Sequence, residues 1–238
     1  MKIVVPMAGR GSRFLNAGET TPKPLIAVRG KPMLYWAMKS VEGVDYSQLI
    51  FIALREHDER YGVTTMLKTL YGKNAEIILL DEVTEGQLCT VLSAEDALDS
   101  PEDVLVMSAD TFVKSKIGKH IAERRDDCAG IISVANLPGD RWSFAKVDET
   151  GRVVEVAEKQ RISDYASTGL YYFSDGKEFV KEAKTMIANK EKTCGEYYVI
   201  PVYQKLIAKG RRVEISLADK VYDMGTPEAL KQVLNVLP

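Results

Sequence analysis

The N-terminal stretch reads Lys2-Ile3-Val4-Val5-Pro6-Met7-Ala8-Gly9-Arg10-Gly11-Ser12-Arg13-Phe14, followed after a short loop by Pro22-Lys23-Pro24-Leu25-Ile26. The apolar run is typical of a buried strand, and the glycines after it let backbone amides approach a ligand closely. Arg13 and Lys23 lie on opposite sides of the loop, and the prolines around Lys23 restrict its backbone. Because amides and cations neutralise phosphate oxygens, this stretch predicts a triphosphate site.

Two common nucleotide motifs are excluded by the same residues. A dinucleotide-binding fold needs G-x-G-x-x-G, but Phe14 stands where the third glycine belongs. The P-loop string G-x-x-x-x-G-K-[ST] does not occur. An ordinary strand-to-helix turn with a surface arginine would also contain Gly-x-Gly, so that pair alone is a weak signal. The continuation to Arg13 and Pro22-Lys23-Pro24 favours the nucleotide site.

This pattern resembles the signature of the sugar-1-phosphate nucleotidylyltransferases, which is G-x-G-x-R, a short loop and then P-K-P. The resemblance covers almost the whole chain and is most specific at the N-terminal motif. It implies a reaction in which a sugar 1-phosphate oxygen attacks the α-phosphate of an NTP and expels pyrophosphate. It also implies that Arg13 and Lys23 are catalytic, and that the nucleotide-binding residues include Ala8, Gly9, Gly11 and Ser12.

Length and composition limit the class of protein. A chain of 238 residues with 45% hydrophobic content can bury a substantial core, and we expect a single domain over 1–238. The net charge of −2 and the lack of a long basic block argue against a nucleic-acid partner. No segment approaches membrane-spanning length, and no signal peptide is expected, so we expect a cytoplasmic enzyme without a membrane partner. The three cysteines are too scattered to predict disulfides or a zinc cluster.

Apolar runs and helical spacings alternate along the chain. After the strand at 2–6, further strands are expected at 49–54, 76–80, 104–110, 130–134, 167–173 and 213–215, with a hairpin at 145–156. Helices are expected at 33–41, 61–71, 177–189 and 197–208, within 85–92, and after Pro227. This order predicts an α/β fold with a Rossmann-like, mostly parallel mixed sheet flanked by helices. The resemblance implies a GT-A-like nucleotidyltransferase fold with a small acceptor-side β lobe.

Two further residues are assigned to the nucleotide. Gln87 follows a glycine at the start of a helix, and its amide offers both a donor and an acceptor to a base edge. The alternative is that Gln87 is only a polar residue of the first helical turn. The resemblance favours base contact, with a slight preference for a pyrimidine, and it also places Ser108 in the nucleotide site.

Two aspartates are candidate metal ligands. Asp110 ends the central strand, and ligands in open α/β sheets collect at the carboxyl ends of strands. A lone aspartate there is usually a cap or turn residue, so a second carboxylate is needed. Asp223 supplies it, in a segment that resembles the family's aspartate followed by G-T-P. We expect Asp110 and Asp223 to hold Mg²⁺, and Thr226 and Pro227 to be the N-cap and first residue of the last helix.

The acceptor site is expected between these aspartates. Glu158 and Lys159 precede Gln160, where the family commonly has proline, and Gly169 lies in a strand that resembles the family's later glycine-containing strand. Glu158 would accept hydrogen bonds from sugar hydroxyls, and Lys159 would hold the acceptor phosphate. Without the resemblance, such a pair is most often solvated and worth little energy. Aromatics at 196–201 belong either to the core or to a wall of the acceptor pocket.

The expected mechanism needs no general base, because the nucleophile is already an anionic phosphate oxygen. The only histidines, His57 and His120, lie in no motif and are expected at the surface. The product would be a nucleotide-sugar for cell-surface polysaccharide synthesis. The nucleobase, the acceptor and the oligomeric state stay open.

Three alternative functions stay open. The first is a glycosyltransferase of a related fold. Those enzymes carry a D-x-D metal motif, whereas this chain has Ser108-Ala109-Asp110. A cytidylyltransferase could instead use a non-sugar metabolite such as phosphocholine. A nucleotide-sensing module without turnover is the third, and the presence of both cations and both aspartates argues against it.

Overall fold

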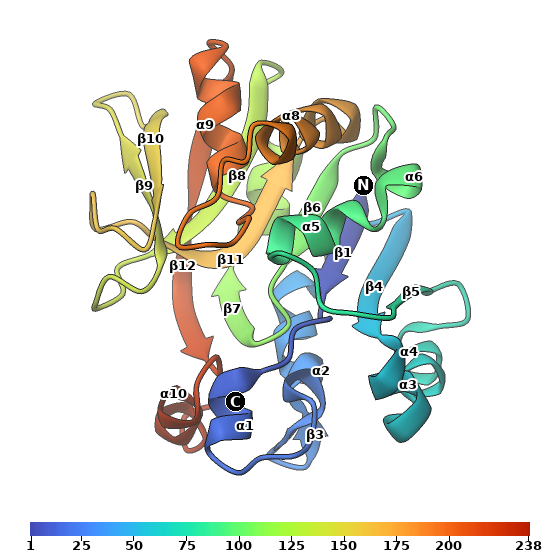
Figure 1. Ribbon diagram of the computed structural model, residues 1–238. Helices are drawn as coiled ribbons and strands as arrows, with labels where there is room; N and C mark the ends of the chain where they lie inside the picture. Colours follow the sequence, from blue (N-terminus) through green and yellow to red (C-terminus); the bar gives the residue numbers. More distant parts are fainter.

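The computed structural model describes residues 1–238, and its main element is a mixed sheet. Its strand order is β5 (Glu76–Leu80), β4 (Gln48–Leu54), β1 (Lys2–Pro6), β6 (Val104–Met107), β11 (Ala166–Phe173), β8 (Cys128–Ala135), β12 (Arg212–Asp223) and β7 (Thr111–Ser115). Only β11 and β7 run against the direction of the other strands on this path. The predicted mostly parallel mixed sheet is therefore confirmed (Figure 1).

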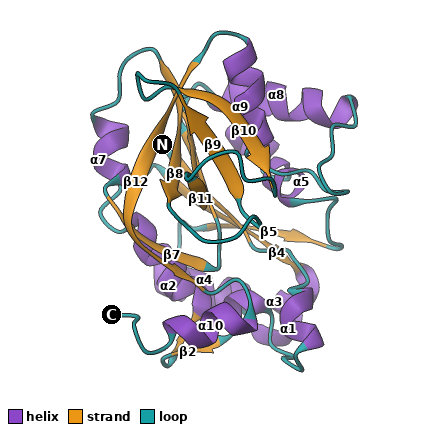
Figure 2. Ribbon diagram, turned by 90° about the vertical axis from the view of Figure 1, so that its left-hand side faces the viewer, coloured by secondary structure: helices purple, strands orange, loops and turns teal.

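Helices cover both faces of the sheet, because successive strand residues point to opposite faces. In β1, Val4 joins one apolar core, while Ile3 and Val5 join the other. The first core packs against α5 (Gln87–Leu92), α6 (Glu95–Leu98), α8 (Gly176–Ala188) and α9 (Pro201–Ala208). The second packs against α2 (Met33–Met38), α4 (Val63–Tyr71) and α7 (Ile117–Ala122). In Figure 2, α8 and α9 lie to the right of the strands and α7 to the left.

A third, smaller core joins the two ends of the chain. It contains Phe14 of α1 (Ser12–Asn16), Trp36 and Met224, together with the rings of Phe112 and Tyr222, which stack with centroids 5.1 Å apart. Beside it lie α10 (Pro227–Val233), the pair β2 (Ala27–Val28) and β3 (Lys31–Pro32), and the 3-10 turn η1 (Lys23–Leu25) (Figure 1). This packing holds the N-terminal loop against the segment that contains Asp223.

Many predicted elements are confirmed. The strand at 76–80 matches β5, and 33–41 forms α2 followed by the 3-10 turn η2 (Lys39–Val41). The hairpin forms as β9 (Ser143–Val147) and β10 (Val153–Glu158), and it projects from the main sheet at the left of Figure 1. The last helix begins as predicted, because the Thr226 side chain accepts a hydrogen bond from the Ala229 amide and Pro227 occupies the first turn.

Two predicted helices start later than expected. Residues 197–200 are not helical, because the Tyr197 amide donates to the Glu85 carbonyl and its carbonyl accepts from the Leu88 amide, each over 3.0 Å. The helix therefore begins at Pro201, which lacks an amide hydrogen and suits a first turn. The helix predicted from residue 61 begins at Val63, since Gly62 (φ +62°) separates it from an unpredicted helix, α3 (Arg55–Tyr61).

Two strand predictions are corrected as well. The strand expected over 104–110 ends at Met107, because the Ser108 amide turns to donate to the Gly169 carbonyl over 2.9 Å. The strand expected at 213–215 extends from Arg212 to Asp223 as β12, pairing first with β8 and then with the unpredicted β7. None of the helices combines the length and the apolar composition that a membrane span requires. Both histidines are partly exposed, as expected for surface residues, and His120 Nδ1 lies 2.7 Å from the Ser216 hydroxyl.

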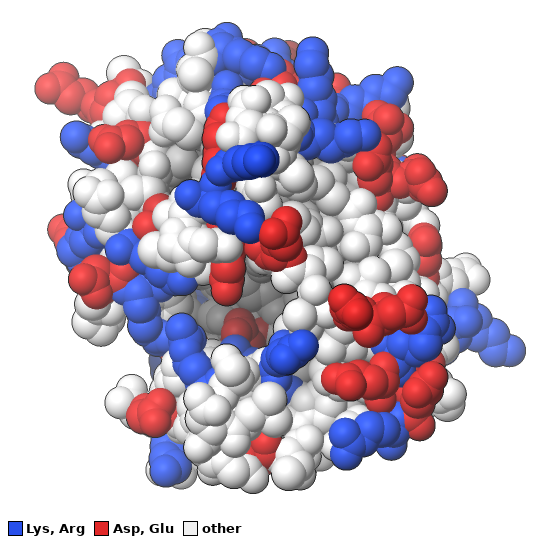
Figure 3. Space-filling model, in the orientation of Figure 1, with Lys and Arg blue, Asp and Glu red and all other residues white.

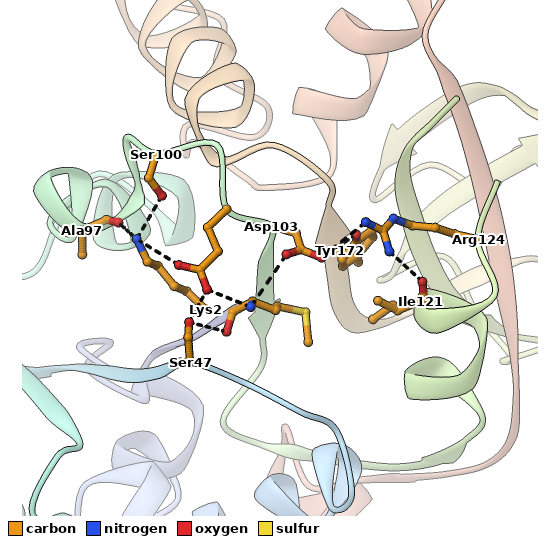
Figure 4. A network of polar contacts seen from close by, with 10 residues as sticks. Lys2, Ser47, Ala97, Ser100, Asp103, Ile121, Arg124 and Tyr172 are labelled. Carbon is orange, nitrogen blue, oxygen red and sulfur yellow. Dashed lines mark hydrogen bonds and ion pairs between the residues drawn. The ribbon is translucent and has the colours of Figure 1, made fainter. Parts of the chain in front are cut away.

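A polar network lies at the amino ends of β1 and β6 (Figure 4). Lys2 donates to the Ser100 hydroxyl over 2.9 Å and pairs with Glu102 at 3.6 Å. The Tyr172 hydroxyl donates to Asp103 over 2.8 Å, and Arg124 lies 3.7 Å from the same carboxylate. The network thus connects β1, β6 and β11 at the end of the sheet opposite the carboxyl end of β1.

The Glu102→Gln variant is expected to lose stability at pH 7 but not at low pH. Hydrogen bonds from the N-terminal ammonium and Ser47, with a smaller opposing effect of burial, lower the pKa of Glu102 from 4.5 to about 2. Because this pKa is depressed in the folded state, its stabilisation is present above pH 4.5 and is lost as the pH falls towards 2. Thermal unfolding of both proteins between pH 7 and pH 2 measures the difference, and exposed Glu149→Gln is the control. A difference in Tm that is equal at every pH would contradict the expectation.

Candidate active site

The glycine loop after β1 packs directly on the Pro-Lys-Pro turn. Gly11 has φ +63°, and a Cβ on it would lie 3.0 Å from the Cβ of Lys23. Glycine is therefore required here by both conformation and space. Arg13, on the following helix, is exposed and lines the same cavity as Lys23. Figure 3 shows a hollow at the centre of this face, with charged side chains of both signs around it.

Lys23 forms an ion pair with Asp110 at the centre of the site. Its Nζ lies 2.5 Å from Asp110 Oδ2 and donates to the Gly225 carbonyl over 2.9 Å. Burial raises the pKa of the Asp110 carboxyl, but the Lys23 ammonium and hydrogen bonds from Lys23 and Thr111 outweigh burial and hold it below its usual range. Asp110 is therefore an ionised carboxylate beside the glycine loop.

The structure brings Asp223 to the same place as Asp110. The Met224 amide donates to the Asp110 carbonyl over 2.9 Å, and the Gly225 amide donates to Asp223 Oδ1 over 2.8 Å. A Cβ on Gly225 would lie 2.9 Å from Asp223 Oδ1 and 3.5 Å from Asp110 Oδ2. The two carboxylates thus face one point, which only a glycine at 225 leaves free. The hard oxygen donors that Mg²⁺ prefers are present in this pair.

A cavity of about 350 Å³ extends from these aspartates towards the β9–β10 hairpin. Its lining includes most of the predicted residues, namely Arg13, Gln87, Ser108, Asp110, Glu158, Lys159, Gly169 and Asp223. Gly169 has φ +87°, and a Cβ on it would lie 2.4 Å from the Ser108 hydroxyl, so the close contact of β11 with Ser108 requires glycine. The residues predicted for the acceptor therefore lie together beside both aspartates.

Glu158 and Lys159 are held by neighbouring hydroxyl groups. Glu158 accepts a hydrogen bond from Ser143, while burial raises the pKa of its carboxyl. Lys159 donates to the Tyr198 hydroxyl, and its Nζ lies 4.6 Å from the centre of that ring. Burial and the adjacent Glu196 carboxylate raise the pKa of Tyr198. Of the two predicted roles for the aromatics at 196–201, Tyr198 forms a wall of the cavity, whereas Tyr197 is buried in the core.

A second cavity, of about 360 Å³, lies between the glycine loop and the start of α5. Its lining includes the predicted residues Ala8, Gly9, Gly11, Ser12 and Gln87. The Thr84 hydroxyl donates to the Gly86 carbonyl over 2.8 Å at its wall and shares a 2.7 Å hydrogen bond with the Thr90 hydroxyl. Ser108 does not line this cavity, but Gln87 lines both and lies where the two cavities meet.

Sequence reasoning missed several polar residues of the site. Arg141 pairs with Asp223 and stacks on the Trp142 ring at 4.1 Å. Ser143 and Thr84 also line the cavities. A basic residue next to an aromatic, just after Pro138 and Gly139 in a loop, is the signal that could have identified Arg141. The partner of Arg141 could not be identified in this way, because Asp223 lies far away along the chain.

The parallel strands, the glycine loop at their carboxyl end and the converging aspartates define a class of α/β proteins that bind nucleotide phosphates. A family model described as nucleotidyl transferase matches residues 2–237, so the chain belongs to this family and is a nucleotidyltransferase. The resemblance inferred from the N-terminal motif is thereby confirmed.

Three relatives illustrate the range of the family. The chain is 24% identical to UTP–glucose-1-phosphate uridylyltransferase AglF of Haloferax volcanii, over 96% of this chain and 93% of the relative. It is 27% identical to 2-aminoethylphosphonate cytidylyltransferase of Lancefieldella rimae, over 72% of this chain and 66% of the relative. A solved nucleoside-diphosphate-sugar pyrophosphorylase from Vibrio cholerae RC9 is 30% identical with a TM-score of 0.84, covering 98% of this chain and 99% of that one.

Proposed function

We propose that this nucleotidyltransferase condenses an NTP with a sugar 1-phosphate to give a nucleotide-sugar and pyrophosphate, as a step in cell-surface polysaccharide synthesis. A phosphate oxygen of the sugar forms a bond to the α-phosphorus as the bond from that phosphorus to the bridging oxygen of pyrophosphate breaks. The observation that carries the proposal is that Asp110 lines the acceptor cavity with Asp223 and also, with Lys23, the pocket formed by Gly9, Gly11 and Gln87 of the nucleotide cavity. An NTP in the first cavity and an acceptor in the second would meet beside these three groups.

The residues present fit a Mg²⁺ ion. Asp110 and Asp223 are carboxylates from separate segments that face one point, and Mg²⁺ is usually held by one or two carboxylates plus substrate phosphates. A bound Mg²⁺ would neutralise negative charge on the reacting phosphates. We therefore propose these two aspartates as its ligands, in agreement with the expectation from the sequence.

The protein's own groups would act by positioning and charge. Arg13 and Lys23 line one small cavity beside the glycine loop. Arg13 would contact the triphosphate there, and Lys23 would bridge the donor and acceptor phosphates. Ala8, Gly9, Gly11 and Ser12 would hold the nucleotide, and Gln87 would contact the base. Ser108 would line the path between the two substrates. No general base is required, because the attacking oxygen is already anionic.

A second candidate acceptor is a phosphorylated metabolite that carries an ammonium group. Its support is the charge distribution of the acceptor cavity, in which Glu158 and Glu196 supplement the cations Arg141 and Lys159. Carboxylates accept hydrogen bonds from sugar hydroxyls and also from ammonium groups. The similarity to a 2-aminoethylphosphonate cytidylyltransferase agrees with this candidate. Uridylyl and cytidylyl relatives together support a pyrimidine base.

The deciding experiment is pyrophosphate release from each of the four common NTPs combined with a panel of sugar 1-phosphates and amino-containing phosphates, with Mg²⁺. Release with one NTP and one sugar 1-phosphate would establish the proposal. Release only with an amino-containing acceptor would establish the second candidate. Release with no pair, together with retained NTP binding, would contradict both candidates and favour the nucleotide-sensing module.

The Glu158→Gln variant is expected to raise the KM for the acceptor by about tenfold, because a hydrogen bond to a charged group contributes about 1.5 kcal/mol. The KM for the NTP should not change, since Glu158 lines only the acceptor cavity. Initial rates at varied acceptor and NTP measure both constants. Glu155→Gln, on the same strand but exposed, is the matched control. An increase in the KM for the NTP would show that the two cavities are assigned wrongly.

A further inference from the structure

Each of the two aspartates at the centre of the site has its own cation, but the two ion pairs differ in how firmly they are held. Lys23 makes a second hydrogen bond to the Gly225 carbonyl and lies between two prolines, and its side chain is 19% exposed. The Arg141 side chain is 41% exposed, and its one hydrogen bond runs from Nη2 to Asp223. Arg141 is therefore the cation that can move away from its carboxylate at the lower cost in free energy.

The loop around Arg141 provides a fixed surface on which the guanidinium can turn. The Trp142 indole donates to the Pro138 carbonyl over 3.0 Å, and the Trp142 carbonyl accepts from the Lys159 amide over 2.9 Å. The guanidinium lies 4.1 Å from this anchored ring. Its remaining N–H donors have no protein partner, and both Arg141 and Lys159 line the acceptor cavity. A phosphate in that cavity is within the range of the side chain when it turns away from Asp223.

We propose that Arg141 competes with the divalent cation for Asp223 and, once displaced, contacts the acceptor phosphate, so that metal binding prepares the acceptor site. This inference rests on the proposed function. A divalent cation at Asp223 repels the adjacent guanidinium, and a phosphate dianion attracts it, because like charges repel and opposite charges attract most strongly at short range. Arg141 then couples the binding of the metal to that of the acceptor, and such coupling is reciprocal.

The test compares Arg141→Met with wild type in two measurements. Mn²⁺ binding is expected to become tighter, and acceptor binding is expected to become weaker. Mn²⁺ binding without substrates, followed by the EPR signal of free Mn²⁺, should be about fivefold tighter in the variant, because a competing, partly exposed ion pair is removed. The KM for the acceptor should rise by at least about tenfold, because a charge-assisted contact to phosphate is lost. The KM for the NTP should stay the same. The conservative Arg141→Lys variant should return both the Mn²⁺ affinity and the KM for the acceptor part of the way to their wild-type values.

Arg152→Met is the matched control, because this arginine lies in the turn of the β9–β10 hairpin and its side chain donates only to the carbonyls of Gly210 and Arg211. It should change neither constant. Unchanged or weaker Mn²⁺ binding in Arg141→Met would overturn the proposal, and so would an unchanged KM for the acceptor. The Mn²⁺ titration needs no turnover. Tighter Mn²⁺ binding in a protein that releases no pyrophosphate with any substrate pair would therefore overturn the proposed function while the competition for Asp223 stands.

Discussion

The Lys23→Met variant is expected to release pyrophosphate about a thousandfold more slowly than wild type. Removal of a single preorganised donor that faces developing negative charge costs about 100- to 1,000-fold in rate. The effect should lie at the upper end here, because Lys23 also holds Asp110 and the Gly225 carbonyl in place. Methionine keeps the length and apolar contacts of the lysine stem. Steady-state pyrophosphate release at saturating substrates measures the loss.

The same variant should also be less stable by about 2 kcal/mol, because the Asp110 carboxylate loses its only cation. A double variant, Lys23→Met with Asp110→Asn, removes both charges and should recover most of this stability without recovering activity. Lys31→Met, which alters a lysine near Tyr35 outside the site, is the control for surface charge. Wild-type activity in Lys23→Met, in spite of its lower stability, would show that the role of Lys23 is structural only.

The Gly86→Ala variant should lower the affinity for the NTP by more than about a hundredfold and the stability by about 3 kcal/mol. Gly86 has φ +140°, and a Cβ on it would lie 2.5 Å from both the backbone nitrogen and oxygen of Tyr197. Backbone atoms cannot turn aside as a side chain can, so the start of α5 must move away from Tyr197. This movement would displace Gln87 and the wall of the nucleotide cavity. Calorimetric NTP titration and thermal unfolding measure the two effects.

Gly72→Ala is a close control for this variant. Gly72 has φ +94°, yet no atom lies within 4 Å of its missing Cβ. The substitution therefore tests backbone strain without a steric clash, and we expect a loss of about 1 kcal/mol with unchanged NTP binding. Equal losses of stability in the two variants would contradict the importance of the contact between Gly86 and Tyr197.

The elements that could be predicted from sequence are those with a strong local signal. The strands at 2–6 and 76–80 have the predicted bounds, because strands in a parallel sheet read as short continuous apolar runs. The last helix begins where Thr226 and Pro227 place it, since capping depends only on adjacent residues.

The elements that were missed depend on distant partners. The second half of β12 contains Asp219 and Lys220, which a local reading places in a loop, yet it pairs with β7. Residues 197–200 carry helical spacing, but the Tyr197 amide and carbonyl bond to residues 85 and 88 instead. Tertiary hydrogen bonds outweigh local propensity in both cases, because propensity differences are less than about 1 kcal/mol per residue.

By itself, the sequence determined the α/β class, the nucleotidyltransferase family and many of the residues that line the two cavities, because these depend on local apolar runs and a compact motif. Only the tertiary structure decided which cation lies against which carboxylate, with Lys23 on Asp110 and Arg141 on Asp223. Ion pairs form across space between loops that the folding of the sheet brings together. Spacing along the chain therefore carries no information about them.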